Sequence, residues 1–267
     1  MKTIGLLAGI GRLPVEFAYA ARAMGFTVIA IGVVPGVEEE LNIAANKTYH
    51  ISVGQLQNIL DVLKEEQVHE VTMLGKVTKE LMFSGKVALD GRMQKLLALL
   101  PDNSDDTIML AFVRELAAEG MGVLDQTAFI RALMPAPGVL TKRQPTPEEI
   151  ADMEFGFSMA KAIGGLDIGQ TVVVKQCAVM AVEAIEGTDA CIRRGGELGR
   201  GGVTVAKVAK PSQDMRFDVP AVGPNTLKAM CEAGAKALVM EAGKTLLVDK
   251  KTVLEIADAK GITIMVK

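Results

Sequence analysis

Thr3-Ile4-Gly5-Leu6-Leu7-Ala8-Gly9-Ile10-Gly11-Arg12-Leu13-Pro14 is the stretch from which the fold class of this chain can be predicted. Residues 3–8 form a short apolar run, which is typical of a buried parallel strand. Gly9 and Gly11 permit a tight turn, and Pro14 stands near the first position of an alanine-rich helix that should run to about residue 24. A strand, a glycine turn and a helix in this order predict an α/β domain.

The glycine turn is also a candidate binding element. Backbone N–H groups at the start of such a helix can bind a phosphate, so Gly9 and Gly11 are candidate substrate-binding residues. The alternative is a tight turn that serves packing alone. The turn lacks the full dinucleotide fingerprint, because Leu13-Pro14 stands where a third glycine would be and no acid closes the second strand, Thr27–Val34. A dinucleotide-dependent oxidoreductase is therefore the less favoured alternative.

The same alternation continues through the first half of the chain. Gly75-Lys76-Val77 follows a strand-like run, and open α/β sheets bind ligands at the carboxyl ends of their strands. Lys76 is therefore a candidate phosphate or sugar contact, with a solvated lysine as the alternative. Strand-like runs cover residues 49–53 and 70–74, and helical patterns cover residues 55–66, 89–99 and 107–118.

A proline-rich segment divides the chain. The segment Pro135–Pro147 contains four prolines and a glycine, which is typical of a linker. Thr146-Pro147-Glu148-Glu149 then predicts the start of a helix that ends near residue 163. We therefore expect an α/β fold of two domains, a Rossmann-like parallel sheet with helices over residues 1–139 and an α/β mixed-sheet domain over residues 140–267.

The second half has a less regular pattern. Glu186-Gly187-Thr188-Asp189 reads as a turn into a short helix, and the glycine-rich stretch Gly195–Gly202 is expected to be mobile. Thr188 is a candidate cap for that helix. Strands are expected at residues 170–175, 178–183, 204–209, 236–240, 245–248 and 262–266, and helices at 225–233 and 250–259.

Composition excludes several classes of function. The chain has 267 residues, of which 49% are hydrophobic and 23% charged, with a net charge of -3, so we expect a folded and mildly acidic protein. Without a basic surplus, nucleic acid is not an expected partner. No apolar run reaches the roughly 18 residues of a membrane span, and the N-terminus has no signal-peptide pattern. A cytoplasmic location is expected, and contact with a membrane surface stays open.

Cysteine and histidine are scarce. Cys177, Cys191 and Cys231 show no ligand spacing and are expected to be reduced and mostly in the core. The two histidines, His50 and His69, cannot form a histidine-rich metal site. A bound metal should therefore be an oxygen-ligated Mg²⁺, with Mn²⁺ as the alternative.

Residues 210–226 contain the largest group of candidate catalytic and binding side chains. Prolines at 211, 220 and 224 predict a rigid polar loop. If the chain is locally extended, Asp214, Arg216 and Asp218 share one face, and a guanidinium between carboxylates suits a phosphate ester and its metal ion. The alternative is an ion-paired loop that only joins two elements.

Roles can be assigned to the polar residues around this loop. Asp218 is the first choice for a carboxylate that binds metal or orients water. Arg216 and Gln213 are expected to bind phosphate or sugar oxygens. Further candidates lie in the turn before the short helix; they are Glu183 and Glu186 as secondary acids, and Thr188 and Asp189 as substrate-binding residues.

This loop also carries a resemblance. Gln213-Asp214-Met215-Arg216-Phe217-Asp218, with Val222-Gly223 and Thr226 after it, resembles the signature of the LpxI family. Matching runs extend over nearly the whole chain; they are Ala8–Pro14, Leu166–Gln170, Glu183–Ala190 and Glu241–Gly243. The runs at 183–190 and 213–226 are specific, whereas the glycine turn alone is weak.

The resemblance implies an activity. LpxI proteins are UDP-2,3-diacylglucosamine pyrophosphatases of lipid A biosynthesis, which release lipid X and UMP with Mg²⁺ by attack of water on the β-phosphorus. It further implies two α/β domains with the lipid held in a cleft between them, an essential aspartate at Asp218, and transient contact with the inner membrane. The oligomeric state stays open between monomer and homodimer.

A third class of function also stays open. Fifteen methionines, which pack adaptably, would suit a non-catalytic protein that binds a lipid or a nucleotide sugar. Such a protein would not need the acids and arginine of the loop at 210–226.

Overall fold

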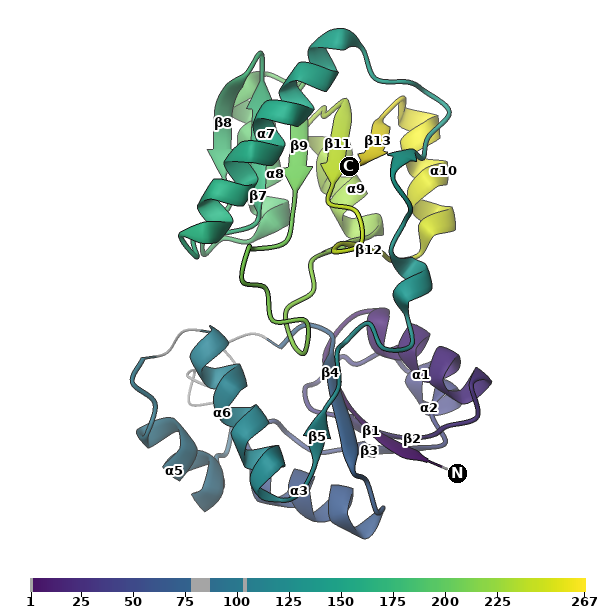
Figure 1. Ribbon diagram of the computed structural model, residues 1–267, viewed down its shortest axis with the longest axis vertical. Helices are drawn as coiled ribbons and strands as arrows, with labels where there is room; N and C mark the ends of the chain where they lie inside the picture. Colours follow the sequence, from purple (N-terminus) through teal and green to yellow (C-terminus); the bar gives the residue numbers. More distant parts are fainter. Residues whose placement is uncertain (1, 78–86, 103–104) are drawn as a thin grey trace. The chain divides into compact units, whose positions relative to one another are not determined.

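The chain folds into two α/β units, as predicted. The computed structural model describes residues 2–77, 87–102 and 105–267. The first unit comprises Met1–Ile130 with Met215–Phe217, and the second comprises Arg131–Asp214 with Asp218–Lys267 (Figure 1). The main division therefore precedes the predicted boundary near residue 140. We call residues 210–226 the signature loop, and three residues of this loop, Met215–Phe217, belong to the first unit.

The first unit is built on a parallel sheet with the strand order β3-β2-β1-β4-β5. β1 lies in the middle, with Ile4 opposite Val28 on one side and Glu70 on the other. This order confirms the Rossmann-like prediction. Its strands are β1 (Thr3–Ala8), β2 (Thr27–Gly32), β3 (Lys47–His50), β4 (Glu70–Leu74) and β5 (Gly122–Val123).

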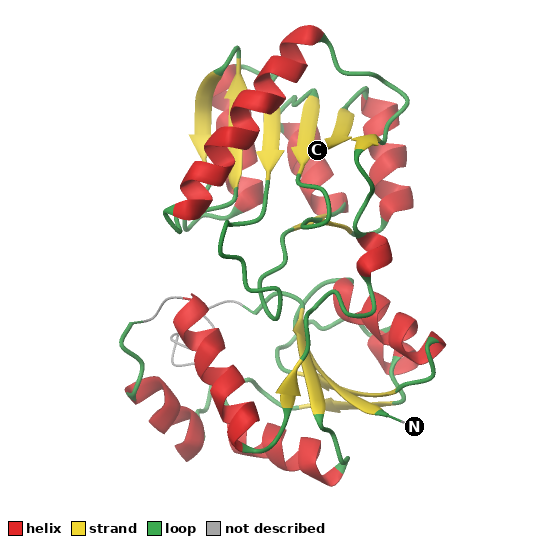
Figure 2. Cartoon of the chain, in the orientation of Figure 1, coloured by secondary structure: helices red, strands yellow, loops and turns green. Residues whose placement is uncertain are grey.

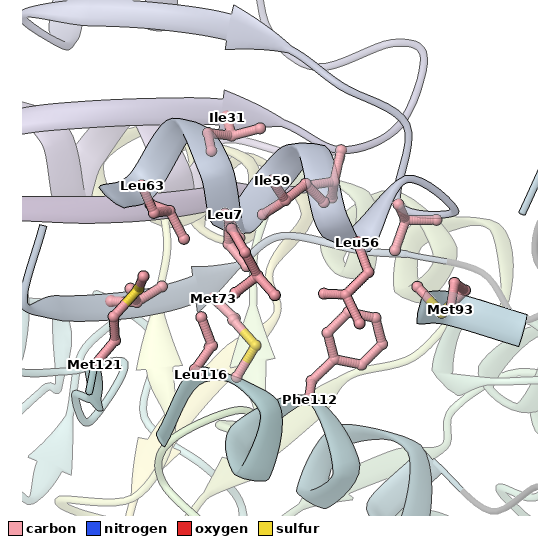
Figure 3. Packing of buried hydrophobic residues seen from close by; sticks show 14 of the residues in the cluster. Leu7, Ile31, Leu56, Ile59, Leu63, Met73, Met93, Phe112, Leu116 and Met121 are labelled. Atoms are coloured by element: carbon pink, nitrogen blue, oxygen red, sulfur yellow. The ribbon is translucent and has the colours of Figure 1, made fainter. Parts of the chain in front are cut away.

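Helices cover this sheet through apolar faces. Leu56, Ile59 and Leu63 follow a helical spacing along α3 and are fully or almost fully buried. Figure 3 shows them beside Leu7 of β1, with Phe112 of α6 opposite. Burial of each such side chain stabilises the fold by about 1.5–3 kcal/mol. The helices are α1 (Leu13–Ala23), α2 (Leu41–Ala44), α3 (Leu56–Glu65), α5 (Gly91–Ala98) and α6 (Asp105–Ala118).

The second unit has a mixed sheet with the strand order β6-β13-β11-β9-β7-β8. β9, β11 and β13 are parallel, β7 runs antiparallel to both β9 and β8, and β6 pairs antiparallel with β13. β8, β9, β11 and β13 therefore all end where β7 begins, and we call this end of the sheet the carboxyl edge. The strands are β6 (Gly138–Val139), β7 (Thr171–Lys175), β8 (Ala178–Val182), β9 (Thr204–Lys207), β11 (Ala237–Met240) and β13 (Thr263–Val266).

Helices lie on both faces of the mixed sheet (Figures 1 and 2). α7 packs Met153 and Ala160 on one face, against residues such as Ala206. On the other face, α8, α9 and α10 share a core with Val205 and Leu238. The helices are η1 (Arg131–Leu133), α7 (Pro147–Gly165), α8 (Thr188–Gly199), α9 (Pro224–Glu232) and α10 (Lys250–Lys260). A separate parallel pair of short strands is formed by β10 (Ala221–Val222), which precedes α9 in the sequence, and β12 (Leu246–Leu247), which precedes α10.

The predicted linker contains the start of an ordered element. Thr146 Oγ1 accepts a hydrogen bond from Glu149 N at 3.3 Å, and the Glu149 carboxylate accepts one from Thr146 N at 2.9 Å. This capping box begins α7 at Pro147, as the sequence pattern predicted. The rest of the segment is less of a linker than expected, because β6 within it pairs with β13.

The prediction of a mobile stretch at Gly195–Gly202 was wrong. Its first half is the end of α8, in which Gly195 and Gly196 are buried. A Cβ on Gly195 would lie 2.5 Å from Val173 Cβ, and one on Gly196 would lie 2.4 Å from Ala233 Cβ. The glycines therefore allow α8 to approach β7 and the end of α9 closely, and the packing offsets their low helix propensity.

The cysteines are all free, in agreement with the prediction, although only Cys191 is fully buried. Cys231 is half-buried and Cys177 is exposed, so the expectation of a mostly buried set was too broad. Among the described residues, no helix combines the length and the apolar character that a membrane crossing requires.

Candidate functional site

The signature loop leaves the carboxyl edge of the second unit at the end of β9. Lys207 ends this strand, and Val208, Ala209 and Lys210 carry the chain into the loop. Gln170, which directly precedes β7, lies at the same edge, where its carbonyl accepts a hydrogen bond from Val208 N at 3.1 Å. The sheet thus brings Gln170 to the end of β9, from which the loop begins.

Asp218 is contacted by two side-chain amides and one lysine. Gln213 Nε2 donates to its carboxylate, Gln170 Nε2 lies 3.4 Å from both of its oxygens, and Lys210 Nζ lies 3.7 Å from Oδ2. The Asp218 side chain is nevertheless 34% exposed. An oriented carboxylate that is still open to solvent is suited to hold a cation or a water molecule.

The loop is compact, so the extended conformation that would place Asp214, Arg216 and Asp218 on one face is not adopted. Asp218 N donates to Asp214 O at 3.1 Å, which closes a turn over the residues between them. Lys210 N donates to Gln213 Oε1 at 2.7 Å, and Gln213 N donates to Lys210 O at 3.2 Å. Gln213 therefore joins the beginning of the loop to Asp218.

Arg216 lies in the part of the loop that belongs to the first unit. Gln126 N donates to Met215 O at 2.8 Å, and Phe217 packs against the core of the first unit. The Arg216 guanidinium lies 6.0 Å from the centre of the Phe217 ring. Of the residues predicted from this loop, Gln213 and Asp218 therefore contact each other within the second unit, whereas Arg216 is placed with the first.

Glu183 is linked to Asp218 through Gln170. Gln170 N lies 3.4 Å from Glu183 Oε2, while the amide group of the same glutamine meets Asp218. Thr188 Oγ1 donates to Glu183 Oε1 at 2.7 Å and accepts from Lys207 Nζ at 2.6 Å. The structure therefore brings the predicted residues Glu183 and Thr188 to the carboxyl edge, together with Lys207, which the sequence analysis missed.

Glu186 and Asp189 have other surroundings. Arg194 donates to the Glu186 carboxylate and thereby lowers its pKa from the usual value, with help from backbone N–H donors. Asp189 stands in the first turn of α8, where its charge acts on Arg193. No hydrogen bond or ion pair recorded for the described residues joins either acid to Asp218.

A partly buried ion pair supports the start of the loop and was also missed. Lys161 Nζ of α7 lies 3.0 Å from Glu241 Oε2 and donates to Ala209 O at 2.8 Å. The same carboxylate accepts a hydrogen bond from Ala209 N at 2.9 Å. Burial raises the pKa of Glu241, but Lys161 and the Ala209 amide lower it by more, so that it lies below its usual value. The sequence signal was a charged residue directly after strand β11.

The oxygen atoms around Asp218 can be compared with the ligands that a divalent cation needs. Among residues 2–77, 87–102 and 105–267, no three His, Cys, Asp or Glu side chains gather in a metal-binding group. Mg²⁺ is often held by one or two carboxylates together with waters and substrate phosphates, however. Gln170 Oε1 is buried and finds no hydrogen-bond partner in the described structure. An unsatisfied oxygen on the same side chain that contacts the Asp218 carboxylate fits an oxygen-ligated cation.

The candidate residues of the first unit meet at the carboxyl ends of β1 and β4. A Cβ on Gly9 would lie 2.7 Å from Lys76 O, so the two turns touch through their backbones. Gly9 N donates to Leu74 O at 2.8 Å, and Ile10 N donates to Lys76 O at 3.0 Å. The turn thus brings Gly9 and Lys76 together. The backbone amides of Gly9 and Ile10 donate within the fold, however, and are not available to a ligand. The Lys76 side chain is exposed, and Gly11 is half-buried with a φ of +112°.

Comparison with known proteins identifies related sequences over the whole chain. The family model described as LpxI N-terminal domain matches residues 3–133, and the model described as LpxI C-terminal domain matches residues 136–265. The curated protein "UDP-2,3-diacylglucosamine pyrophosphatase LpxI" of Caulobacter vibrioides is 33% identical over 277 residues, which cover 99% of this chain and 97% of that protein.

Two solved structures show a distant likeness. N5-carboxyaminoimidazole ribonucleotide synthetase from Thermotoga maritima is 16% identical with a TM-score of 0.25, over 70% of this chain and 42% of that one. Phosphoribosylglycinamide synthetase from Anaerococcus prevotii is 12% identical with a TM-score of 0.28, over 69% and 39%. Likeness at this level does not extend to activity or substrate.

Proposed function

The chain belongs to the LpxI family, and from that premise we propose that it hydrolyses the pyrophosphate bond of UDP-2,3-diacylglucosamine to 2,3-diacylglucosamine 1-phosphate and UMP, a step of lipid A biosynthesis. It is accordingly a hydrolase, a pyrophosphatase acting on a phosphoric anhydride. The observation that carries the proposal is the carboxylate of Asp218, which two glutamine amides and a lysine contact at the carboxyl edge and which still reaches solvent.

Asp218 has the chemistry that hydrolysis requires. The oxygen of a water molecule forms a bond to phosphorus, the bridging P–O bond breaks, and the bridging oxygen leaves with the electron pair. Asp218 orients this water and accepts its proton, while Gln213 and Gln170 fix the direction of the carboxylate. Bound Mg²⁺, or Mn²⁺ in its place, would neutralise charge on the phosphoryl oxygens, with Asp218 and Gln170 as the residues that hold it.

The proposed substrate also implies where the protein works. Its acyl chains reside in a lipid bilayer, so the protein must meet a membrane surface transiently to collect it. We place the reaction at the cytoplasmic face of the inner membrane. This location follows from the substrate, and binding to vesicles that contain UDP-2,3-diacylglucosamine would test it.

The proposal is tested by release of UMP. Purified protein is incubated with UDP-2,3-diacylglucosamine and Mg²⁺, with a chelator in a parallel sample. Wild type should release UMP, the chelator should stop the release, and Asp218→Ala should lower kcat by about 100-fold or more. Asp167→Ala is the matched control, because Asp167 also pairs with Lys210, at 2.5 Å, but is 60% exposed and has no place in the mechanism.

Each outcome of this assay has a meaning. Release that survives in Asp218→Ala would move the catalytic carboxylate elsewhere, with Glu183 as the next candidate. Release that survives the chelator would remove the metal from the proposal. Folded wild-type protein that binds the substrate without turnover would support a non-catalytic carrier, and a bound dinucleotide in the purified protein would support an oxidoreductase.

A further inference from the structure

Lys207 is a buried lysine that the proposed mechanism has not used. It is the last residue of β9 and is only 8% exposed. Its position two residues after Val205 places it on the face of the sheet that α8 covers. There Lys207 Nζ donates to Thr188 Oγ1 at 2.6 Å, at the first residue of α8.

The charge of Lys207 is poorly balanced within the fold. In the described part of the chain, no carboxylate oxygen lies within the 4.0 Å of an ion pair from its Nζ, and Thr188 is the acceptor recorded for it. The other lysines of the carboxyl edge differ, since Lys161 is 3.0 Å from Glu241 and Lys210 is 2.5 Å from Asp167. An ammonium group has three donors, so Lys207 can take further acceptors.

The position of Lys207 beside the N-terminus of α8 adds to the excess of positive charge. The N-terminus of a helix carries partial positive charge, which repels a cation and attracts an anion. The N-cap residue of α8 is Gly187, which has no side chain and makes no capping hydrogen bond. A buried ammonium next to an uncapped helix start is unfavourable for folding unless an anion completes the arrangement. Glu183 compensates in part, through the hydroxyl of Thr188.

We propose that Lys207 Nζ, beside the start of α8, binds a non-bridging phosphoryl oxygen of a phosphate or pyrophosphate ester. Thr188 positions the ammonium, and Glu183 in turn fixes Thr188. Gln170 connects this group to Asp218, so the bound phosphoryl group lies at the same edge as the hydrolytic carboxylate. That the ester is a UDP-sugar pyrophosphate rests on the proposed function, whereas binding of the anion does not.

Binding of inorganic pyrophosphate in metal-free buffer tests the anion site directly. Calorimetry on wild type, Lys207→Met, Lys207→Arg and Lys175→Met should show pyrophosphate affinity reduced by about 10- to 100-fold in Lys207→Met, partly recovered in Lys207→Arg and unchanged in Lys175→Met. Lys175 is the matched control, because its Nζ donates to Gly199 O at 2.7 Å and Gly201 O at 2.9 Å at the opposite end of α8.

The proposal is overturned if wild type does not bind pyrophosphate, if Lys207→Met binds it like wild type, or if Lys175→Met loses as much affinity. A crystal structure of wild type with pyrophosphate decides the matter if Lys207→Met does not fold. An anion oxygen at about 2.7–3.2 Å from Lys207 Nζ supports the site, and an anion bound elsewhere overturns it.

The two proposals can fail separately. UMP release by Lys207→Met at the wild-type kcat/KM would overturn the role of Lys207 and leave the hydrolase intact. Pyrophosphate binding that depends on Lys207, in a protein that never releases UMP, would overturn the hydrolase and keep the anion site. A loss in Lys207→Met that Lys207→Arg partly restores in both assays supports both.

Discussion

Single residues at the carboxyl edge differ in how much of their charge is balanced by the protein itself. Glu241 is 12% exposed and is held by Lys161 and by the Ala209 amide, so it stabilises the beginning of the signature loop. Asp218 is more exposed, and two of its three partners, Gln170 and Lys210, lie at 3.4 Å and 3.7 Å. The well-paired carboxylate of Glu241 thus supports the structure, whereas we assign the more exposed carboxylate of Asp218 to the reaction.

Glu241→Gln should destabilise the protein by about 1–3 kcal/mol at neutral pH, because Lys161 loses its charged partner. The folded pKa of Glu241 lies below the unfolded value of 4.5, so its stabilising effect is complete above that value and is lost as the pH falls through the folded pKa. The difference in unfolding free energy between wild type and variant should therefore shrink on acidification below about pH 4.5.

Glu232→Gln provides the control for this measurement. Glu232 pairs with Arg193 at 2.6 Å, but both side chains are more than 40% exposed (43% and 47%), and solvent screens such pairs. Urea unfolding at several pH values should show little effect of this variant. A Glu241→Gln difference that grows towards low pH would contradict the assigned ion pair.

Gly75→Ala tests the contact between the two turns of the first unit. Gly75 has a φ of +92°, and a Cβ there would lie 2.7 Å from Gly9 C, so the variant combines backbone strain with a clash. We expect a loss of about 2–4 kcal/mol in unfolding free energy. Gly91→Ala should be neutral or stabilising, because Gly91 starts a helix and a Cβ there meets no atom within 4 Å. Equal effects of the two variants would refute this account.

At the scale of elements, the sequence predicted best where local pattern and packing agree. The apolar run of β1 and the amphipathic spacing of α3 were recognised because each buries one continuous surface. α8 was partly missed, because its glycines favour mobility locally and only the contacts with Val173 and Ala233 make them favourable. β6 has two residues and exists through its pairing with β13, which no local pattern reveals.

The candidate site shows the same limit. Gln213 and Asp218 were found because they stand close together in a distinctive run of sequence. Gln170 is 48 residues from Asp218, and Lys161 is 80 residues from Glu241, so these contacts depend on the strand order of the sheet. Lys207 was missed because a lysine at the end of a strand is normally exposed, and only the position of α8 buries it.

Thr146→Ala tests the element whose start was predicted from sequence. Removing the hydroxyl leaves the Glu149 amide without its capping acceptor at the start of α7. We expect a loss of about 1 kcal/mol in unfolding free energy, measured by chemical denaturation. Ser158→Ala, in the middle of the same helix, removes a hydroxyl that donates to Glu154 O and should change stability little. A neutral Thr146→Ala would show that the box does not determine the helix start.

At the scale of the whole molecule, the first unit is completed by residues from far along the chain. Phe217 packs on its core, and Gln126 holds Met215 through a backbone hydrogen bond. Residues just before and after this segment belong to the second unit. The stability of the first unit therefore depends on the integrity of a loop that carries the proposed catalytic aspartate.

Phe217→Ala should destabilise the first unit selectively, by about 1–3 kcal/mol, because a partly buried ring leaves its core. Hydrogen exchange should become faster at the amides of β1 and β4 and stay unchanged in β9 and β11. Phe155→Ala is the matched control, since Phe155 is partly buried against the α7 face of the second unit. It should shift protection in β9 and β11 instead. Equal effects of both variants on both sheets would mean that the units unfold together.

The return of Met215–Phe217 to the first unit also limits how such a gene can change. A break in the gene between the codons of Ile130 and Arg131 would give an N-terminal product without Phe217 and a C-terminal product that carries it away from its partners. An insertion or deletion between Asp214 and Asp218 would displace either Phe217 or the carboxylate of Asp218. Recombination that exchanges one half of the gene must therefore preserve the length of this loop.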